Sequence, residues 1–338
     1  MLSYIFRRLL SAIPFLFLVS LTVFILIQLP PGDFVDSWAA AKSASGEVVD
    51  PAMMADMRHR YGLDQNIFVQ YVQWIGVWHD SSGHWDGILQ GNFGYSFEWN
   101  SPVSLLIGER MNLTLILSVA TLMLTWAIAL PIGIYSAVRR YSVGDYFFTF
   151  IGFIGLAVPH FLIALVLMYL GVKYWSMDVT GLFSPEFANA EWSWDRFVDL
   201  LHHLWIPMII LGLGSTASLI RIMRANLIDQ LYMPYVVTAR AKGLSEVRLL
   251  LKYPVRIALN PFVSTIGFIL PHLISGAVIT SIVLNLPTAG PLLYQSLLSQ
   301  DIYLSGAFLL LLCMMTVVGT LISDILLVIL DPRIRLEQ

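Results

Sequence analysis

The sequence has 338 residues, of which 57% are apolar and only 12% are charged. A soluble domain carries roughly 25% charged residues, so this composition excludes a soluble protein and predicts an integral membrane protein. The formal net charge is −3, but in a membrane protein the side on which each charge lies matters more than the sum. The single cysteine, Cys313, excludes an intrachain disulfide and a cysteine-based metal site.

Six apolar segments are long enough to cross a bilayer as helices, because a hydrocarbon core of about 30 Å takes about 20 helical residues. We therefore expect an all-α integral membrane protein with six transmembrane helices. The predicted spans cover residues 9–29, 113–137, 146–172, 204–219, 262–286 and 307–330. The fourth is the shortest.

The first predicted span follows a basic start, MLSYIFRRLL, as the core of a signal peptide would. Its apolar run is longer than the roughly 7 to 15 residues of such a core, and the QLPPGD after it lacks a small-residue cleavage pattern. We interpret it as an uncleaved transmembrane helix.

The basic residues predict which loops are cytoplasmic. Thirteen of the 19 lie at the N-terminus, after the second span, in the loop 220–261 and in the tail, so the positive-inside rule places both termini in the cytoplasm. The opposite side is acidic, with ten acidic residues in 33–109 and five in 178–199. The thirteen basic residues are Arg7, Arg8, Arg139, Arg140, Arg221, Arg224, Arg240, Lys242, Arg248, Lys252, Arg256, Arg333 and Arg335.

This topology divides the chain into three regions. Residues 1–30 form an N-terminal transmembrane helix, and residues 31–112 form a large extracytoplasmic loop region between the first and second helices. Residues 113–338 form a five-helix core that contains the cytoplasmic loop 220–261.

Prolines occur inside three of the predicted spans, at Pro131, Pro159 and Pro271. A proline removes a backbone hydrogen bond, so each marks either a packing kink or a hinge that lines a pathway. Gly276, in the fifth span, is a further candidate for such a hinge.

Asp324 is the only acidic residue well inside a predicted span. An intramembrane carboxylate is a candidate for function, for instance in a proton relay. It lies about two turns from the basic sequence DPRIR, so a structural role near the inner interface is the alternative, and we favour it.

The sequence supplies no set of catalytic residues and no metal site that we can assemble. The seven histidines are scattered, and HDSSGH at 79–84 offers two ligands without zinc-type spacing. None of the four lysines lies in a G-x-x-x-x-G-K-[ST] phosphate loop, so the chain has no nucleotide hydrolysis site of that kind. If ATP drives its activity, the ATPase is another protein.

The loop after the fourth span has a helix–turn–helix pattern. Residues 235–241 predict a helix that presents Val236, Thr238 and Ala239 as small or apolar surface, and Gly243 is placed to end it. Ser245 then caps a second helix, whose apolar side comprises Leu249, Leu250, Val255 and Leu259. Such an element fits a groove of a partner protein, or it lies on anionic lipid through its basic residues.

Several ordered motifs carry a resemblance to a known family. TARAKGL at Thr238–Leu244 resembles the cytoplasmic loop of permease subunits of ATP-binding cassette (ABC) importers, in the dipeptide, oligopeptide and nickel branch. Similar segments occur along nearly the whole chain: RRLL, LPPGD, YGLDQNIFVQYVQW, GNFGYSFEWNSPV, ERMNLTL and LDPRIR.

This resemblance implies the type I importer permease fold and a coupling helix that docks into an ATPase. Ala239 and Gly243 match the last alanine and the glycine of the family motif, whereas Val237 stands where a glutamate is common, and LPTAG at Leu286–Gly290 departs from a P-G-x-G turn. The docking residues would be Tyr235, Thr238, Ala239, Arg240, Ala241, Lys242, Gly243 and Leu244.

The resemblance also implies a set of partners in a bacterial inner membrane. These are a homologous second permease, two ATP-binding cassette ATPases, an extracytoplasmic binding protein and membrane lipid, with no nucleic acid. ATP and Mg²⁺ would bind to the ATPases, and this chain would bind no cofactor. Substrates in this branch include dipeptides, longer peptides, nickel and oligosaccharides, and transport is by alternating access.

Two other classes of protein remain open alternatives. A secondary transporter or channel that acts without ATPases would have paired intramembrane charges or inverted repeats, and we detect only Asp324 and no repeat. A membrane-embedded enzyme would need converging catalytic groups.

Overall fold

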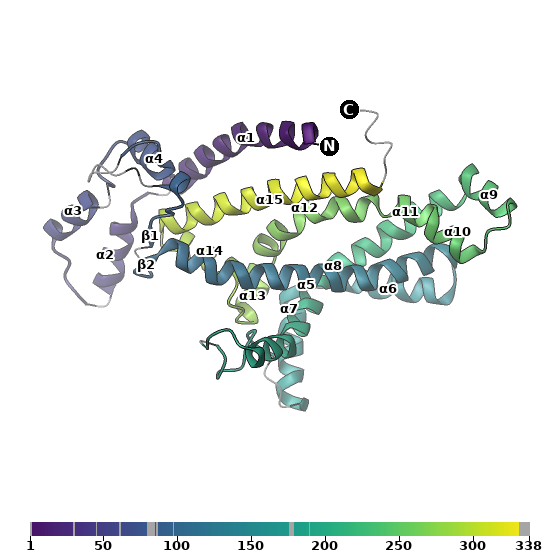
Figure 1. Ribbon diagram of the computed structural model, residues 1–338. Helices are drawn as coiled ribbons and strands as arrows, with labels where there is room; N and C mark the ends of the chain where they lie inside the picture. The colour runs from purple at the N-terminus through teal and green to yellow at the C-terminus, as the bar shows by residue number, and fades with distance from the viewer. Residues whose placement is uncertain are drawn as a thin grey trace. The chain divides into compact units, whose positions relative to one another are not determined.

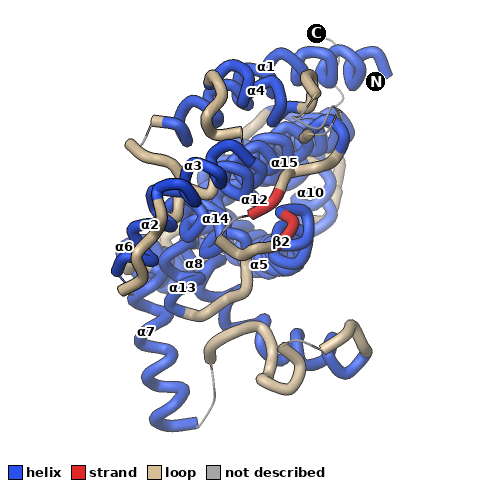
Figure 2. Tube along the Cα trace, turned by 90° about the vertical axis from the view of Figure 1, so that its left-hand side faces the viewer, coloured by secondary structure: helices blue, strands red, loops and turns tan. Residues whose placement is uncertain are grey.

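The computed structural model describes residues 2–29, 31–44, 46–60, 62–79, 85, 87–96, 98–175, 179–188 and 190–330. Helices make up most of this chain (Figures 1 and 2). They form two compact units, Met1–Leu113 with Thr288–Met315 and Thr114–Pro287 with Thr316–Gln338. Each unit is described by itself.

The first unit contains α1 (Leu2–Gln28), α2 (Phe34–Ala44), α3 (Pro51–Arg60), α4 (Ile67–Ile75), the 3-10 turn Ile88–Gln90, a hairpin of β1 (Tyr95–Ser96) and β2 (Ser101–Pro102), α14 (Ala289–Leu298) and the start of α15 (Ile302–Leu330). Its core includes an aromatic cluster of Phe24, Tyr71 and Trp74 with Leu310. The hydroxyls of Ser20 and Tyr71 lie 2.8 Å apart. These contacts hold α4 against α1.

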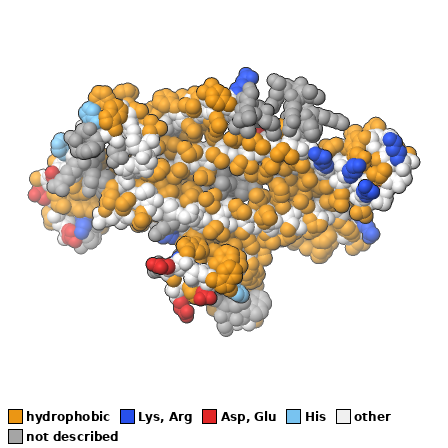
Figure 3. Space-filling model, viewed as in Figure 1, with side chains coloured by type: hydrophobic (Ala, Val, Ile, Leu, Met, Phe, Trp, Pro, Cys, Tyr) orange, Lys and Arg blue, Asp and Glu red, His pale blue; other side chains and the backbone are white. Residues whose placement is uncertain are grey.

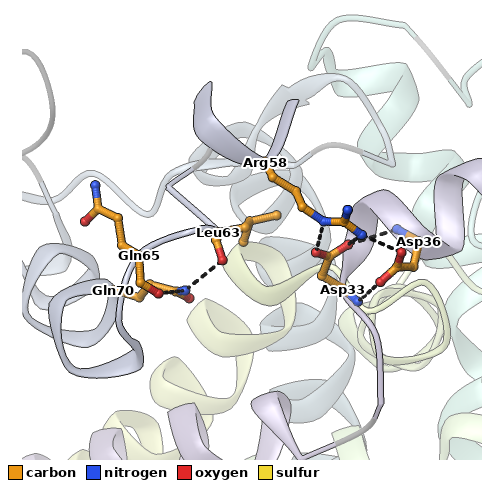
Figure 4. Close-up of polar contacts among 6 residues, drawn as sticks. All are labelled: Asp33, Asp36, Arg58, Leu63, Gln65 and Gln70. Atoms are coloured by element: carbon orange, nitrogen blue, oxygen red, sulfur yellow. Dashed lines mark hydrogen bonds and ion pairs between the residues drawn. The ribbon is translucent and has the colours of Figure 1, made fainter. Parts of the chain in front are cut away.

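The LPPGD sequence leads into a charged clamp at the start of α2. The N–H of Asp36 donates to Asp33 Oδ1 at 2.9 Å, and the N–H of Asp33 donates to Asp36 Oδ2 at 3.0 Å, which makes a reciprocal helix cap. Arg58 of α3 donates to Asp33 Oδ2 at 2.7 Å and also bonds Asp36 (Figure 4). The clamp therefore fastens α3 to the first turn of α2.

A buried carboxylate ties the hairpin to α15 in the same unit. The Ser96 hydroxyl donates to Asp301 Oδ2 at 2.5 Å, and both residues have no exposed surface. Asp301 Oδ1 also accepts the N–H of Leu304, so it caps the start of α15. A side chain on Gly94 would lie 2.5 Å from the Tyr303 ring, so only glycine permits this close approach.

The second unit contains most of α5 (Val103–Val138), α6 (Val143–Ala157), α7 (His160–Leu170) with a short π-helix (Gly171–Trp175), α8 (Trp194–Leu231), α9 (Pro234–Ala241), α10 (Glu246–Lys252), α11 (Pro254–Ala258), α12 (Asn260–Gly276), α13 (Val278–Val283) and the rest of α15. A buried cluster in this unit comprises Ala129, Ala137, Leu219, Ile220, Met223, Leu227, Val255, Ala258 and Phe262. The cluster joins α5, α8, α11 and α12.

Four helices in the described residues are long and apolar enough to cross a membrane: Phe6–Leu26, Val103–Val138, Trp194–Leu231 and Ile302–Leu330. A bent pair, Val143–Ala157 and His160–Tyr174, makes up to five if it counts as one span. Its 100° bend falls at Val158 and Pro159. The residue before a proline is driven out of the helical conformation, and Val158 has φ −91° and ψ 127°.

The fourth and fifth predicted spans differ from the observed helices. The fourth, predicted over 204–219, is the middle of a 38-residue helix, α8. The fifth, predicted over 262–286, is divided at Ala277 into α12 and α13. With 17 residues, α12 is shorter than the roughly 20 helical residues that cross a hydrocarbon core.

Candidate functional site

The candidate site is the α9–α11 segment, residues 234–258. Pro234 occupies the first turn of α9, where a missing N–H costs no hydrogen bond, after Met233 in an extended conformation. At the other end, the N–H groups of Gly243 and Leu244 donate to the carbonyls of Arg240 and Ala239. Gly243 has φ +78°, and no heavy atom lies within 4 Å of where a Cβ would be. The left-handed conformation, rather than lack of space, therefore requires glycine at this turn.

A small buried cluster holds α9 against α10. Val236 and Leu249 have no exposed surface, Ala239 is 7% exposed, and Tyr235, Leu244 and Tyr253 pack around them. The prediction that Val236 and Ala239 form outward surface is therefore wrong. They lie three residues apart on one helix face, and that face is covered by Leu249 of the following helix.

An ion pair crosses the turn on the outside of this cluster. Arg240 Nε lies 2.7 Å from Glu246 Oε1, and Nη2 lies 3.2 Å from Oε2. The hydrogen bond raises the pKa of Arg240 and lowers the pKa of Glu246. Both groups are exposed, so the pair orients the two helices more than it stabilises the fold.

The outer surface of the segment combines basic and apolar side chains. Val237, Val247 and Leu251 are more than half exposed, and Thr238, Ala241 and Lys242 are exposed beside them. Lys and Arg side chains gather over α9 and α10 (Figure 3). Exposed apolar groups with basic residues around them are suited to binding another macromolecule.

The segment is fastened to two long helices of the second unit. The Tyr235 hydroxyl donates to Gln230 Oε1 of α8 at 2.7 Å. Arg256 donates to the carbonyls of Leu330 at 3.0 Å and Ile329 at 3.3 Å, where α15 ends. A cation at a helix C-terminus satisfies free carbonyls and complements the helix dipole. The segment is therefore attached to the end of α8 and to the end of α15.

Residues 129–336 match the family described as binding-protein-dependent transport system inner membrane component. The chain belongs to this family. Residues 1–118 match the N-terminal region described for such membrane components. As a transport membrane component, this chain is not itself expected to catalyse a reaction.

Named relatives cover almost the whole of this transport component. It is 35% identical to the oligopeptide transport system permease protein AppB of Bacillus subtilis, over 99% of this chain and 100% of that protein. It is 29% identical to the dipeptide transport system permease protein DppB of Escherichia coli K12, over 99% of both chains. It is 31% identical to the glutathione transport system permease protein GsiC of Salmonella paratyphi A, again over 99% of both.

The intramembrane candidates lie in different helices of the transport component. Pro131 is inside the continuous helix α5, whereas Pro159 stands at the break before α7. Pro271 and Gly276 are within α12, and their surroundings lie outside what the structure describes. Asp324 lies in the last third of α15. The DPRIR sequence, and all of HDSSGH except His79, lie outside the described residues.

The sequence analysis missed a buried pair, Asp145 and Arg224. Asp145 directly precedes the third predicted span and was not among the candidate residues, and Arg224 served only as a marker of the cytoplasmic side. The structure joins them with two hydrogen bonds of 2.9 Å. The pattern Ser142-x-x-Asp145 signals the start of a helix, but no local signal identifies a partner 79 residues away.

Proposed function

We propose that this chain is the transmembrane permease subunit of an ATP-driven ABC importer, which moves peptides or related small solutes by alternating access. The observation that carries the proposal is the α9–α11 segment, which has an exposed basic and apolar surface and is fastened to α8 and α15. The names of the relatives refer to oligopeptides, dipeptides and glutathione, which supports peptides as the substrate class.

The proposed partners are a homologous second permease, two ATP-binding cassette ATPases, an extracytoplasmic binding protein and membrane lipid. The family description supports the binding protein, and the lack of a phosphate loop in the sequence supports separate ATPases. ATP and Mg²⁺ would bind to the ATPases, and this chain would bind no cofactor of its own.

In this mechanism the α9–α11 segment is the coupling element. ATP binding draws the ATPases together, the segment follows the ATPase to which it is docked, and α8 and α15 move with it. ATP shifts the permease toward the outward-open state only as far as its binding differs between the two states. The bend at Pro159 and the break at Ala277 are the proposed hinges of the pathway.

We further propose six membrane crossings with both termini in the cytoplasm. The four long helices and the bent α6–α7 pair support up to five of these crossings, and we propose the α12–α13 pair as the sixth. Within the second unit, basic side chains gather over α9 and α10, and acidic side chains gather over the segment between α7 and α8 (Figure 3). This separation follows the positive-inside rule if α9 and α10 are cytoplasmic.

Co-purification tests the proposal directly. We expect an ATPase subunit to be recovered with the wild-type chain and lost with Gly243→Pro, because a proline cannot adopt φ +78°. Gly108→Ala, a helical glycine with no neighbour within 4 Å, is the matched control and should retain the ATPase. Substrate uptake by this chain alone would contradict the proposal and favour an ATP-independent transporter or channel.

A further inference from the structure

An ion pair joins two long helices of the second unit. Arg224 of α8 directs its guanidinium at Asp145 in the first turn of α6, with Nε 2.9 Å from Oδ1 and Nη2 2.9 Å from Oδ2. Two parallel charge-assisted hydrogen bonds fix the relative orientation of the groups as well as their separation.

Asp145 is almost completely enclosed. Its side chain is 3% exposed, and that of Arg224 is 28% exposed. Asp145 Oδ2 also accepts the N–H of Tyr141 at 2.9 Å. Because the Asp145 carboxylate is buried, loss of Arg224 leaves it without its compensating charge, which is unfavourable. If the start of α6 moved away from α8, the Asp145 carboxylate would therefore lose its partner or be exposed.

Arg224 lies on the turns of α8 that carry the α9–α11 segment. The neighbouring Met223 and Leu227 pack in one cluster with Val255 and Ala258 of α11. Farther along α8, Gln230 accepts the hydrogen bond from Tyr235. A force applied to the segment therefore reaches the same turns of α8 that hold Asp145.

Farther along, α6 and α8 meet at two glycines of α6. A Cβ on Gly152 would lie 3.6 Å from Ala217 Cβ, and one on Gly155 would lie 3.0 Å from Leu213 Cγ. These glycines let the two helices approach closely, with the Leu213 side chain packed against Gly155. The ion pair adds a charged attachment at the start of α6, and α6 then leads to the 100° bend before α7.

We propose that Asp145 and Arg224 are positioning residues for transport, which make α6 follow α8 so that displacement of the α9–α11 segment reaches the bent α6–α7 span. This inference rests on the proposed function. Without the pair, the ATPases continue to hydrolyse ATP, but the movement of α6 no longer follows that of α8. Fewer substrate molecules then cross the membrane for each ATP.

The test uses the complete importer, reconstituted in proteoliposomes with its binding protein and a dipeptide. Arg224→Lys keeps the charge but loses the planar fork, and Asp145→Asn keeps the shape but loses the charge. We expect each variant to lower the ratio of dipeptide transported to ATP hydrolysed about tenfold, with hydrolysis largely retained. The reciprocal pair Asp145→Arg with Arg224→Asp should recover part of the ratio. Arg221→Lys, at an exposed position one turn earlier on α8, is the control and should match the wild type.

Three results would overturn the inference: an unchanged ratio, a parallel loss of uptake and hydrolysis, or failure of all the pair variants to assemble. The last two would assign the pair to folding alone. The wild-type importer distinguishes failure of this inference from failure of the proposed function. If the wild type showed no ATP-driven dipeptide uptake, the proposed function would fail and the inference with it. If the wild type showed uptake but the variants gave one of the three results above, the inference alone would fail.

Discussion

At Gly243 a single backbone angle shapes the surface offered by α9 and α10. The residue has φ +78° and open space around its missing Cβ, so a substitution meets conformational strain and no collision. An L-residue pays about 1–2 kcal/mol for the left-handed conformation, and asparagine adopts it more readily than alanine does. The effect of a substitution at Gly243 therefore depends on how readily the new residue adopts the left-handed conformation, and not on its size.

We predict that Gly243→Ala weakens ATPase binding by roughly 5- to 30-fold, which corresponds to the strain of about 1–2 kcal/mol. Gly243→Asn should weaken it less. Titration of purified ATPase against the permease in nanodiscs measures the dissociation constants. Equal affinities for the wild type and both variants would show that the turn does not position the docking surface.

The clamp at Asp33 gives the α2–α3 region a dependence on pH. Burial alone would raise the pKa of Asp33, but the hydrogen bond from Arg58, together with two backbone N–H groups, outweighs it and lowers the pKa below the ordinary 3.8. A carboxyl whose folded pKa is lowered stabilises the fold above its unfolded pKa. That stabilisation is lost as the pH falls through the folded value.

We therefore predict that the α2–α3 region becomes easier to cleave below about pH 4, as Asp33 is protonated and releases Arg58. Limited proteolysis with an acid-active protease at a series of pH values measures this. Asp33→Asn should remove most of the change, with easier cleavage already at neutral pH. Cleavage of the wild type that does not vary across this range would show that the clamp contributes nothing to the loop.

At the scale of elements, local signals predicted the boundaries around the α9–α10 turn, but they did not predict partners far apart in the sequence. The start of α9 follows from Pro234 and its end from Gly243, and α10 begins after Ser245 as predicted, although the Ser245 side chain makes no capping hydrogen bond. By contrast, α8 extends beyond the predicted span at both ends. Its polar residues there look like loop residues in the sequence, but Asp199 bonds Ser184 and Arg224 bonds Asp145. Such partners depend on the folded arrangement, which hydropathy cannot show.

The crossing of α12 and α15 depends on glycine. A Cβ on Gly267 would lie 2.9 Å from the backbone nitrogen of Thr320, and Gly319 lies equally close to Gly267 in return. Backbone atoms cannot yield as the end of a flexible side chain does. The two helices must therefore separate if either glycine gains a side chain.

We predict that Gly267→Ala destabilises the protein by about 1–3 kcal/mol, the usual cost of overpacking a tight contact. Its melting temperature in detergent should fall by several degrees. Gly152→Ala is the comparison, because its Cβ would make an ordinary 3.6 Å contact with Ala217 and should be tolerated. Equal melting temperatures for the two variants would contradict the role assigned to Gly267.

At the scale of the whole molecule, the sequence predicted the class and the family, whereas the count of membrane spans stays a prediction. Among the described residues there are four long apolar helices, or up to five with the bent pair, because the bend at Pro159 and the break at Ala277 divide the other apolar segments. The α9–α11 segment carries the surface proposed to bind the ATPase. Tyr235 attaches this segment to α8, and Arg256 attaches it to α15.

ATP-driven peptide uptake tests this account most directly. The permease pair, the ATPases and the binding protein are reconstituted in proteoliposomes, and uptake of a labelled dipeptide is followed with each component omitted in turn. We predict uptake only with ATP and all components present, and its loss with Gly243→Pro although the permease still inserts in the membrane. Uptake by this chain without ATP or ATPases, or undiminished uptake with Gly243→Pro, would contradict the account.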